Sequence, residues 1–452
     1  MKSKVVQGAT LYPCDVNDEG RGNGSIFFEF IVGVPMQFTV KRTFTLLAAA
    51  ALLVACDKKQ DAVTPVPRAA STAPTPATPA NSVVKIGHVG PISGAIAHLG
   101  QDNENGARMA IEELNASGVT IDGKKVTLEL MAEDDAADPK QGTAVAQKLV
   151  DAKVNGVVGH LNSGTTIPAS RLYRDAGIPQ VSPSATHPKY TRQGFKTAFR
   201  LVADDAHLGG TLGKYAVGSL KARAIAVIDD RTAYGQGVAE EFTKAVQAAG
   251  GKVVVKEFTT DKATDFNAIL TTIKGKKPDV VFFGGMDAVA GPMIKQMQSL
   301  GITAKFMGGD GICSTELVKL GGDAIADDQV FCAEAGGVEG EGRADMEAFR
   351  ARFKARFNTD VQVYAPYVYD AVKLLVSSMV KAHSAEPEKY LPVLAATADY
   401  KGLTGTISFD ERGDIKNGAL TLKTVRGGKL ETLAVIRGSS GGIGLVVGAR
   451  RR

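Results

Sequence analysis

Runs of apolar residues alternate with stretches of helical spacing along most of the chain. Val83–Val89 predicts a first strand, and Asn103–Asn115 places its apolar residues on one helical face. Further strands are expected over Lys125–Ala132 and Val154–Leu161, with another ending at Ser182, each after a helical segment. This order is typical of a parallel sheet with right-handed crossovers and helices on both faces.

The same alternation starts again near residue 205, so a second α/β domain is predicted. Two long helices, Gly342–Phe357 and Tyr364–His383, and two late strands, Ile407–Gly413 and Ala419–Val425, follow it. A helical pair after a complete sheet indicates a return to the first domain, with crossing segments as a hinge and a cleft between the domains. The second series comprises helices over 207–220, 236–249, 266–274 and 288–300 and strands over 223–229, 252–258, 279–283 and 305–307.

Two neighbouring strands of the first series end in small, hydroxyl-bearing residues. Val154–Leu161 stops at Asn162-Ser163-Gly164-Thr165-Thr166, and the next strand ends at Ser182–Thr186. Ligands of open α/β sheets bind at the edge where such strands end, and a helix N-terminus there favours an anion. We expect a carboxylate at this edge. The alternative is that Ser163 only caps its helix.

The pattern of the first 82 residues indicates a targeting signal and a linker, and not a folded domain. Residues 36–56, MQFTVKRTFTLLAAAALLVAC, have the charged start, apolar stretch and small-residue end of an export signal, too short to span a membrane. Leu53-Val54-Ala55-Cys56 resembles the lipobox of bacterial lipoproteins, whose Cys is lipidated, and Asp57 resembles an inner-membrane retention signal. The alternative is a secreted protein with a chance Cys56. Residues 1–35 look like an upstream mis-start, 57–82 like a disordered linker and 438–452 like a disordered tail.

Composition and charge narrow the class of protein. A length of 452 residues exceeds one core, so two or more domains are expected. The net charge of +5 comes from residues 1–82 and the last three arginines, and residues 83–449 are neutral, which argues against nucleic acid. No CxxC pair, HxxxH spacing or GxxxxGK[ST] loop is present, so we expect no metal, no cofactor and no catalytic residues.

Only Cys313 and Cys332 fall in the predicted folded part. In an oxidising compartment a bridge between them is plausible, and closing a loop of about twenty residues would stabilise the fold by roughly 3 kcal/mol. Two buried free thiols are the alternative.

Short motifs in order and at matching spacing resemble those of type I periplasmic binding proteins, above all the leucine/isoleucine/valine-binding proteins of ABC importers. The resemblance covers about Val84–Lys429. It implies two Rossmann-like three-layer α/β/α lobes joined by a multi-crossing hinge, one of residues 83–204 and 333–420 and one of residues 205–332 and 421–437. The motifs are Gly90-Pro91-x-Ser93-Gly94, Asn105-Gly106-Ala107, Asp138-Pro139-Lys140-Gln141, Gly159-His160-Leu161, Pro168-Ala169-Ser170, Ser182-Pro183-x-Ala185-Thr186, Tyr234-Gly235-x-Gly237, Phe306-Met307-Gly308 and Phe409-Asp410-x-x-Gly413-Asp414.

The resemblance implies roles for residues on both sides of the cleft. Ser163 is similar to the family Ser that holds the ligand carboxylate, and backbone N–H groups across Ser184-Ala185-Thr186 would complete that grip. The Ser184 carbonyl and the Thr186 hydroxyl would take the ammonium, and Asp310 stands where the family has a Glu that pairs with it. Both charges of a dehydrated zwitterion need partners, because an unpaired buried charge costs several kcal/mol. Asp310 could instead be an ordinary turn residue.

The side-chain pocket implied by the resemblance departs from the family pattern. Tyr234 matches an aromatic that closes over the ligand, although it could also be a core-edge residue at a helix start. Leu99 and Met286 replace two family tyrosines, which keeps the pocket apolar and leaves its selectivity open. Ala137 and Asn162 stand where the family has a disulfide.

The resemblance implies a non-enzymatic substrate-binding component that traps a branched-chain or other aliphatic amino acid and delivers it to ABC permease subunits. We expect a monomer in the periplasm, lipid-anchored to the inner membrane through Cys56. A periplasmic sensor, or a binding protein for a short amide or urea, is the alternative. A cytoplasmic ligand-sensing regulator is a third, against which the export signal argues.

Overall fold

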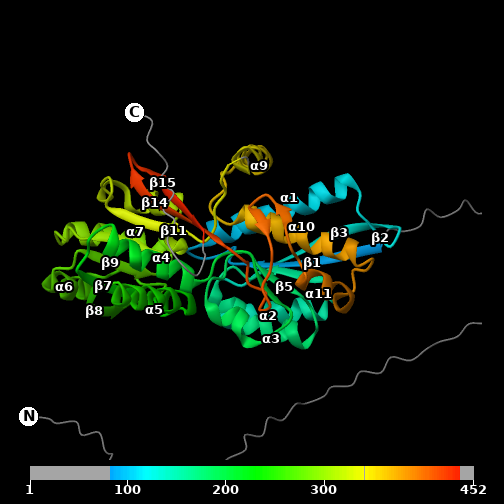
Figure 1. Cartoon of the computed structure of the whole chain (residues 1–452), viewed down its shortest axis with the longest axis horizontal. Helices are drawn as coiled ribbons and strands as arrows, with labels where there is room; N and C mark the ends of the chain where they lie inside the picture. Colours follow the sequence, from blue (N-terminus) through cyan, green and yellow to red (C-terminus); the bar gives the residue numbers. More distant parts are fainter. Residues whose placement is uncertain (1–81, 341, 438–452) are drawn as a thin grey trace, which may run out of the picture. The chain divides into compact units, whose positions relative to one another are not determined.

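The computed structural model describes residues 82–340 and 342–437. These residues form a six-stranded sheet, a seven-stranded sheet and a small two-stranded sheet (Figure 1). The predicted export signal, Cys56, the linker and the Gly-rich tail lie outside the described residues. Within the described part, no helix combines the length and apolar character that crossing a bilayer requires.

The first sheet has the strand order β2-β3-β1-β4-β5-β6, and all its pairs are parallel except β2 with β3. This confirms the parallel sheet predicted for the first series. The strands are β1 (Ser82–Gly90), β2 (Thr120–Ile121), β3 (Lys124–Asp134), β4 (Gly156–Gly159), β5 (Gln180–Ser182) and β6 (Ala198–Arg200).

Helices cover both faces of the first sheet. In Figure 1, α1 and α10 lie above it and α2 and α3 below it. One apolar core packs α1, α9 and α10 against the sheet, and a smaller one packs α2 and α3. We call this sheet and its helices the first lobe. The helices are α1 (Ala97–Ser117), α2 (Pro139–Asp151), α3 (Ser163–Asp175), α9 (Gly342–Phe357), α10 (Ala365–Lys381) and α11 (Pro387–Ala395).

Helix α1 begins six residues before the predicted start at Asn103. Its first turns are polar and lack apolar spacing, but Asp102 is buried there. The Asp102 carboxylate accepts backbone N–H groups of residues 362–365, which lead into α10. A tertiary contact therefore sets the start of this helix.

The second sheet has the order β15-β14-β11-β10-β9-β7-β8, parallel from β11 to β8, with β14 and β15 antiparallel at one edge. Its strands are β7 (Ala224–Asp229), β8 (Lys252–Phe258), β9 (Val280–Gly284), β10 (Lys305–Gly308), β11 (Val330–Glu334), β14 (Ala419–Arg426) and β15 (Lys429–Arg437).

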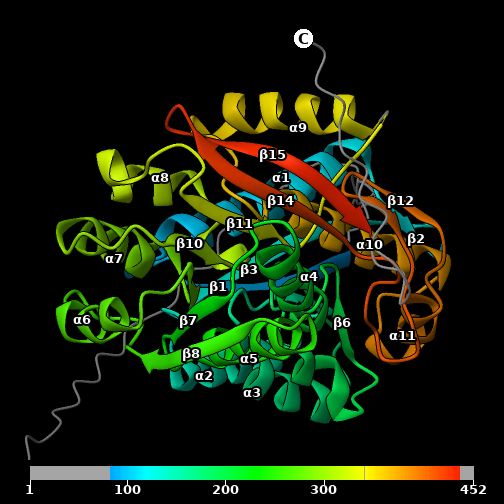
Figure 2. The same ribbon diagram turned by 60° about the vertical axis from the view of Figure 1, so that its left-hand side comes forward.

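The second sheet is also covered on both faces, and with its helices it forms the second lobe. One core packs α4 and α5 against the sheet, and another packs α6, α7 and α8 (Figure 2). The α/β class with two parallel-dominated sheets is thus confirmed. The helices are α4 (Asp205–Gly218), α5 (Ala233–Ala248), α6 (Asn267–Lys276), α7 (Asp287–Ser299) and α8 (Thr315–Gly321).

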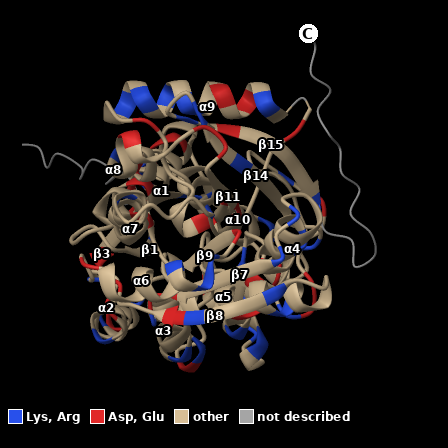
Figure 3. Ribbon diagram, turned by 90° about the vertical axis from the view of Figure 1, so that its left-hand side faces the viewer, with Lys and Arg blue, Asp and Glu red and all other residues tan. Residues whose placement is uncertain are grey.

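The chain passes between the lobes three times: after β6, after β11, and before β14. The predicted return to the first lobe is confirmed, since α9, α10 and α11 contribute to its core. Figure 3 shows charges of both signs along α9, whose Met346, Phe349 and Phe353 are buried. The residues at which each lobe begins and ends stay a prediction.

The predicted strand Ile407–Gly413 is wrong for most of its length. Only Ile407 belongs to a strand, as the last residue of β13 (Gly405–Ile407), which pairs with β12 (Tyr400–Gly402). The Asp410 carboxylate accepts the N–H groups of Arg412 and Asp414, which closes a turn. That local bond competes with strand pairing.

Candidate functional site

The two strand ends singled out in the sequence are tied together by hydrogen bonds. After β4, the His160 carbonyl accepts the hydroxyls of Ser182 and Thr166, both at 3.1 Å. The Ser184 hydroxyl donates to the Leu161 carbonyl at 2.9 Å. The loops that follow β4 and β5 therefore form one bonded platform.

Ser163 is not the cap of its helix. The N-cap of α3 is Asn162, whose side chain makes no capping bond, and Ser163 is the first helical residue. The Ser163 hydroxyl, 1% exposed, accepts the N–H of His187 at 3.2 Å and so joins the two loops. The backbone N–H groups in the first turn of α3 therefore receive no hydrogen bond from the side chain of the N-cap.

A small cavity, which we call the inner cavity, lies where this platform meets the second lobe. Its volume is about 10 Å³, room for about one water. An amino acid can enter only if the two walls move apart. Its lining includes five predicted site residues, namely Ser163, Ser184, Tyr234, Met286 and Asp310. The other lining residues are Leu161, Asn162, Gly311 and Tyr364.

The remaining predicted residues, Leu99, Ala185 and Thr186, are buried but do not line the inner cavity. The Ala185 N–H donates to the Ser182 hydroxyl at 2.9 Å. Leu99 is buried in the same apolar cluster as Tyr234 and Met286. The binding roles of these residues stay a prediction.

Asp310 begins a short 3₁₀ turn directly after β10, and its carboxylate is buried in the cavity wall. One oxygen accepts the Tyr234 hydroxyl at 2.8 Å and the other accepts the Tyr364 hydroxyl at 2.7 Å. Burial raises the pKa of Asp310 to about 6, although both hydroxyls oppose the rise. Asp310 is thus both a turn residue and a buried acid between two tyrosines.

Tyr364 is a site residue that the sequence pattern does not single out. It is the N-cap of α10, so it belongs to the first lobe, whereas Asp310 belongs to the second. Asp102 holds it in place by accepting its backbone N–H at 2.9 Å. The only signal in the sequence is its position at the start of a predicted helix.

Asp205, the first residue of α4, is a second residue that the pattern does not mark. Its carboxylate and the Thr186 hydroxyl are buried, and neither forms a hydrogen bond of ordinary geometry within the described part of the chain. Burial raises the pKa of Asp205 well above its usual range, Thr186 opposes that shift, and the charge of Asp310 adds to it. A buried acid without a well-formed hydrogen bond is costly, so this corner of the site suits a cation.

A larger cavity of about 470 Å³, the outer cavity, adjoins the inner one. The two share Asn162, Tyr234 and Met286 in their linings. The rest of its wall comes from residues at or near the starts of α1, α2 and α3 in the first lobe and of α5 and α7 in the second, and from the loop between β8 and α6. Its lining is Ser93, Gly94, Ala95, Ile96, Ala136, Ala137, Asp138, Pro139, Asn162, Gly164, Arg231, Thr232, Ala233, Tyr234, Asp261, Lys262, Met286, Ala288 and Val289.

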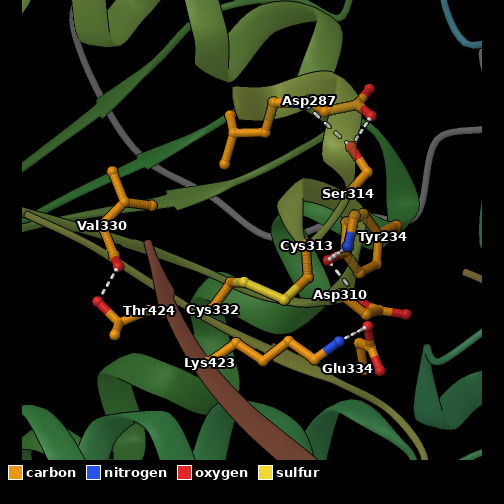
Figure 4. The surroundings of a disulfide bond; sticks show 12 residues. Tyr234, Asp287, Asp310, Cys313, Ser314, Val330, Cys332, Glu334, Lys423 and Thr424 are labelled. Atoms are coloured by element: carbon orange, nitrogen blue, oxygen red, sulfur yellow. Dashed lines mark hydrogen bonds and ion pairs between the residues drawn. A yellow bond between two sulfur atoms is a disulfide. The ribbon is translucent and has the colours of Figure 1, made fainter. Parts of the chain in front are cut away.

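A disulfide joins Cys313 to Cys332, with 5.5 Å between the Cα atoms. Cys313 ends the turn that Asp310 begins, and Cys332 lies in β11, so the bridge ties the Asp310 turn to the sheet (Figure 4). The next residue, Ser314, donates its hydroxyl to Asp287 at the start of α7.

Comparison with known proteins places the chain in a family. The family model described as periplasmic binding protein matches residues 83–429. The leucine-, isoleucine-, valine-, threonine- and alanine-binding protein of Pseudomonas aeruginosa is 36% identical over 339 residues, 75% of this chain and 88% of that protein. Leu/Ile/Val-binding protein homolog 1 of Brucella abortus is 37% identical over 326 residues, 72% of this chain and 86% of its own length.

Solved structures agree with this assignment. The branched-chain amino acid transporter substrate binding protein LivJ from Streptococcus pneumoniae, in complex with isoleucine, has a TM-score of 0.71 at 28% identity and covers 79% of this chain and all of that one. The leucine binding protein LivK from Thermotoga maritima has the same TM-score at 25% identity, with 78% and 98% coverage. The chain therefore belongs to the type I periplasmic binding proteins of the leucine/isoleucine/valine-binding kind, two-lobed solute-binding proteins that are not enzymes.

Proposed function

We propose that this protein is the substrate-binding component of an ABC importer and captures an aliphatic α-amino acid between its two lobes. One observation carries the proposal: the Ser163 platform and the Asp310 carboxylate face each other from different lobes across a buried cavity. The names of its relatives, which bind leucine, isoleucine and valine, support the same class of ligand.

The platform of the first lobe suits the ligand carboxylate. The Ser163 hydroxyl and the uncapped first turn of α3 offer hydrogen-bond donors, and the positive end of the helix dipole favours an anion. Ser184 lines the same cavity. Charge-assisted bonds of this kind are stronger than neutral ones, which helps to offset dehydration of the carboxylate.

Acidic groups suit the ligand ammonium. Asp310 lies across the cavity from the platform, and Asp205 with Thr186 supplies buried oxygens that form no hydrogen bond of ordinary geometry among the described residues. An ammonium at this place would pair with Asp310 and donate to these oxygens. Because both ends of the ligand are matched, a zwitterion is favoured over a simple carboxylate or amine.

Capture requires opening and closing rather than chemistry. The Tyr364 bond to Asp310 joins the lobes beside a space for about one water, so an amino acid must separate the walls before they close on it. A ligand that contacts both walls binds the closed state best and shifts the population toward it. The permease of the importer would recognise that closed form.

We also propose that the protein is exported and lipid-anchored at Cys56, as a monomer on the periplasmic side of the inner membrane. The signal-like residues 36–56 support this. Replacing Cys56 with Ser should release the protein from membranes, measured by fractionation of cells. A Cys56→Ser variant that still sediments with membranes would overturn the anchor.

A thermal-shift screen tests the capture function. The protein is heated with each of the twenty amino acids, short amides and urea, and a ligand that binds the native state raises the melting temperature. We expect an aliphatic amino acid to stabilise it. If only an amide or urea does so, the alternative function is favoured, and if no amino acid does, the proposal fails.

A further inference from the structure

We infer that Asn162 and the outer cavity determine specificity, and that they favour an amino acid with a long side chain carrying an N–H group. This inference rests on the proposed capture of an amino acid and goes beyond the aliphatic class: aliphatic amino acids bind, and those with a side-chain N–H group bind more tightly. Asn162 lies at the junction of the two cavities and lines both. A ligand with its charged groups in the inner cavity therefore extends its side chain past Asn162.

The outer cavity has room for more than a short aliphatic side chain. Its volume of about 470 Å³ falls in the range of pockets that hold whole drug-sized ligands. Its lining includes apolar side chains, among them Met286, Ile96 and Ala137, and polar side chains, among them Thr232 and Lys262. Such a wall suits a long side chain with apolar and polar parts.

The Asn162 side chain supplies the polar preference. Its Oδ1 is buried and has no hydrogen-bond partner in the part of the chain that the structure describes. A purely aliphatic side chain would leave this acceptor unpaired, whereas an amide, ureido or guanidino N–H would pair with it. Sites with a buried polar group discriminate strongly against ligands that lack its partner. Asn162 and Ala137 are also the two positions at which the resembled family has a disulfide and this chain does not.

Calorimetry with matched ligands tests this inference. Leucine, norleucine, glutamine and citrulline are titrated into the protein and into the Asn162→Leu variant, with the ligand-free melting temperature as the control for folding. We expect glutamine or citrulline to bind the unaltered protein about tenfold more tightly than norleucine, and Asn162→Leu to remove that preference while leucine binding changes little. Tightest binding of leucine, with no effect of Asn162→Leu on the ranking, would overturn the inference and leave the capture function intact. No binding of any amino acid would instead reject the capture function.

A separate observation points to a second feature. We propose that His98 and Asp287 form a proton-dependent latch between the lobes, which regulates the proposed capture. His98 belongs to α1 of the first lobe and Asp287 to α7 of the second, and their Nε2 and Oδ2 atoms lie 2.7 Å apart. Asp287 is fully buried and also accepts the Ser314 hydroxyl, whereas the His98 side chain is 22% exposed and can exchange protons with water.

The surroundings of His98 favour its protonated form in the closed state. Burial lowers its pKa, but the hydrogen bond and charge of Asp287 outweigh burial, and Glu316 on α8 and Asp102 on α1 add to the rise. When the lobes separate, His98 loses Asp287 and its pKa returns toward 6.5, the usual value for a histidine. Closure is therefore favoured below pH 6.5, and this contribution is lost as the pH rises through the raised pKa.

Leucine affinity at pH 6.5 and pH 8.5 tests the latch. We expect the affinity of the unaltered protein to fall about fivefold over this range, an ordinary coupling between two sites. His98→Gln keeps a neutral hydrogen bond to Asp287 and should remove the pH dependence. The control is His383→Asn. His383 is exposed and has a positive φ, which Asn tolerates. The leucine affinity of this variant should change with pH as that of the unaltered protein does. A His98→Gln variant with the full pH dependence would overturn the latch, whereas no leucine binding at either pH would count against the capture function.

Discussion

The two walls of the inner cavity are built in different ways. Apart from the Tyr364 side chain, the wall of the first lobe consists of strand ends and a helix start. Ser184 donates to the Leu161 carbonyl, and Ser163, the first residue of α3, accepts the His187 N–H. The wall of the second lobe consists of side chains, Asp310, Tyr234 and Met286, on separate elements. One wall therefore depends on backbone geometry, and the other on the identity and support of single side chains.

The largest effect is expected from the second wall, in the Asp310→Asn variant. This change keeps the shape and removes the charge that would pair with the ligand ammonium, so leucine affinity should fall by about 3 kcal/mol, roughly 100-fold. Calorimetry measures the loss. Asp399→Asn is the control, because Asp399 is an exposed acid that lines neither cavity and has a positive φ that Asn also adopts. Equal affinity of both variants would remove Asp310 from the site.

The support of that wall can be tested through the disulfide. In the double variant Cys313→Ser, Cys332→Ser, the Asp310 turn is no longer tied to β11. The free energy of unfolding should fall by about 3 kcal/mol, since the bridge closes a loop across a sequence separation of 19 residues. Denaturant unfolding measures this. If the bridge also positions Asp310, leucine affinity should fall as well, and an unchanged affinity would limit its role to stability.

The pH dependence below neutrality should also come from the second wall. Burial raises the pKa of Asp310 to about 6, and only the ionised carboxylate pairs with an ammonium. Leucine affinity should therefore rise with pH through 6 and be about tenfold lower at pH 5 than at its plateau. The sign is opposite to that of the His98 latch, which acts above pH 6.5. Calorimetry on the His98→Gln variant isolates the Asp310 step, and a flat profile between pH 5 and 6.5 would contradict it.

The contrast between the two walls also explains which site residues can be predicted from the sequence and which cannot. The first wall follows from local pattern: apolar runs that stop at hydroxyl clusters place Ser163 and Ser184 at one sheet edge. Tyr364 and Asp205 escape prediction, because each reaches the site only through tertiary packing, Tyr364 held by Asp102 and Asp205 buried at a helix start.

Features of the fold that depend on tertiary contacts are likewise not predicted from the sequence. The alternation of strands and helices predicts both sheets, whereas the early start of α1 and the turn at Asp410 depend on hydrogen bonds of single carboxylates. Those bonds have no period along the chain, so a hydropathy pattern does not register them.

The smallest effect is expected from the first wall, in the Ser163→Ala variant. Backbone N–H groups of α3 remain in this variant, so the ligand carboxylate loses only one hydroxyl bond and leucine affinity should fall by about 1 kcal/mol, roughly fivefold. The hydroxyl also accepts the His187 N–H, so the ligand-free melting temperature must be measured beside the affinity. A loss of affinity at an unchanged melting temperature identifies a ligand contact. Equal losses of stability and affinity would instead assign Ser163 to joining the two loops, and would leave the backbone alone to bind the carboxylate.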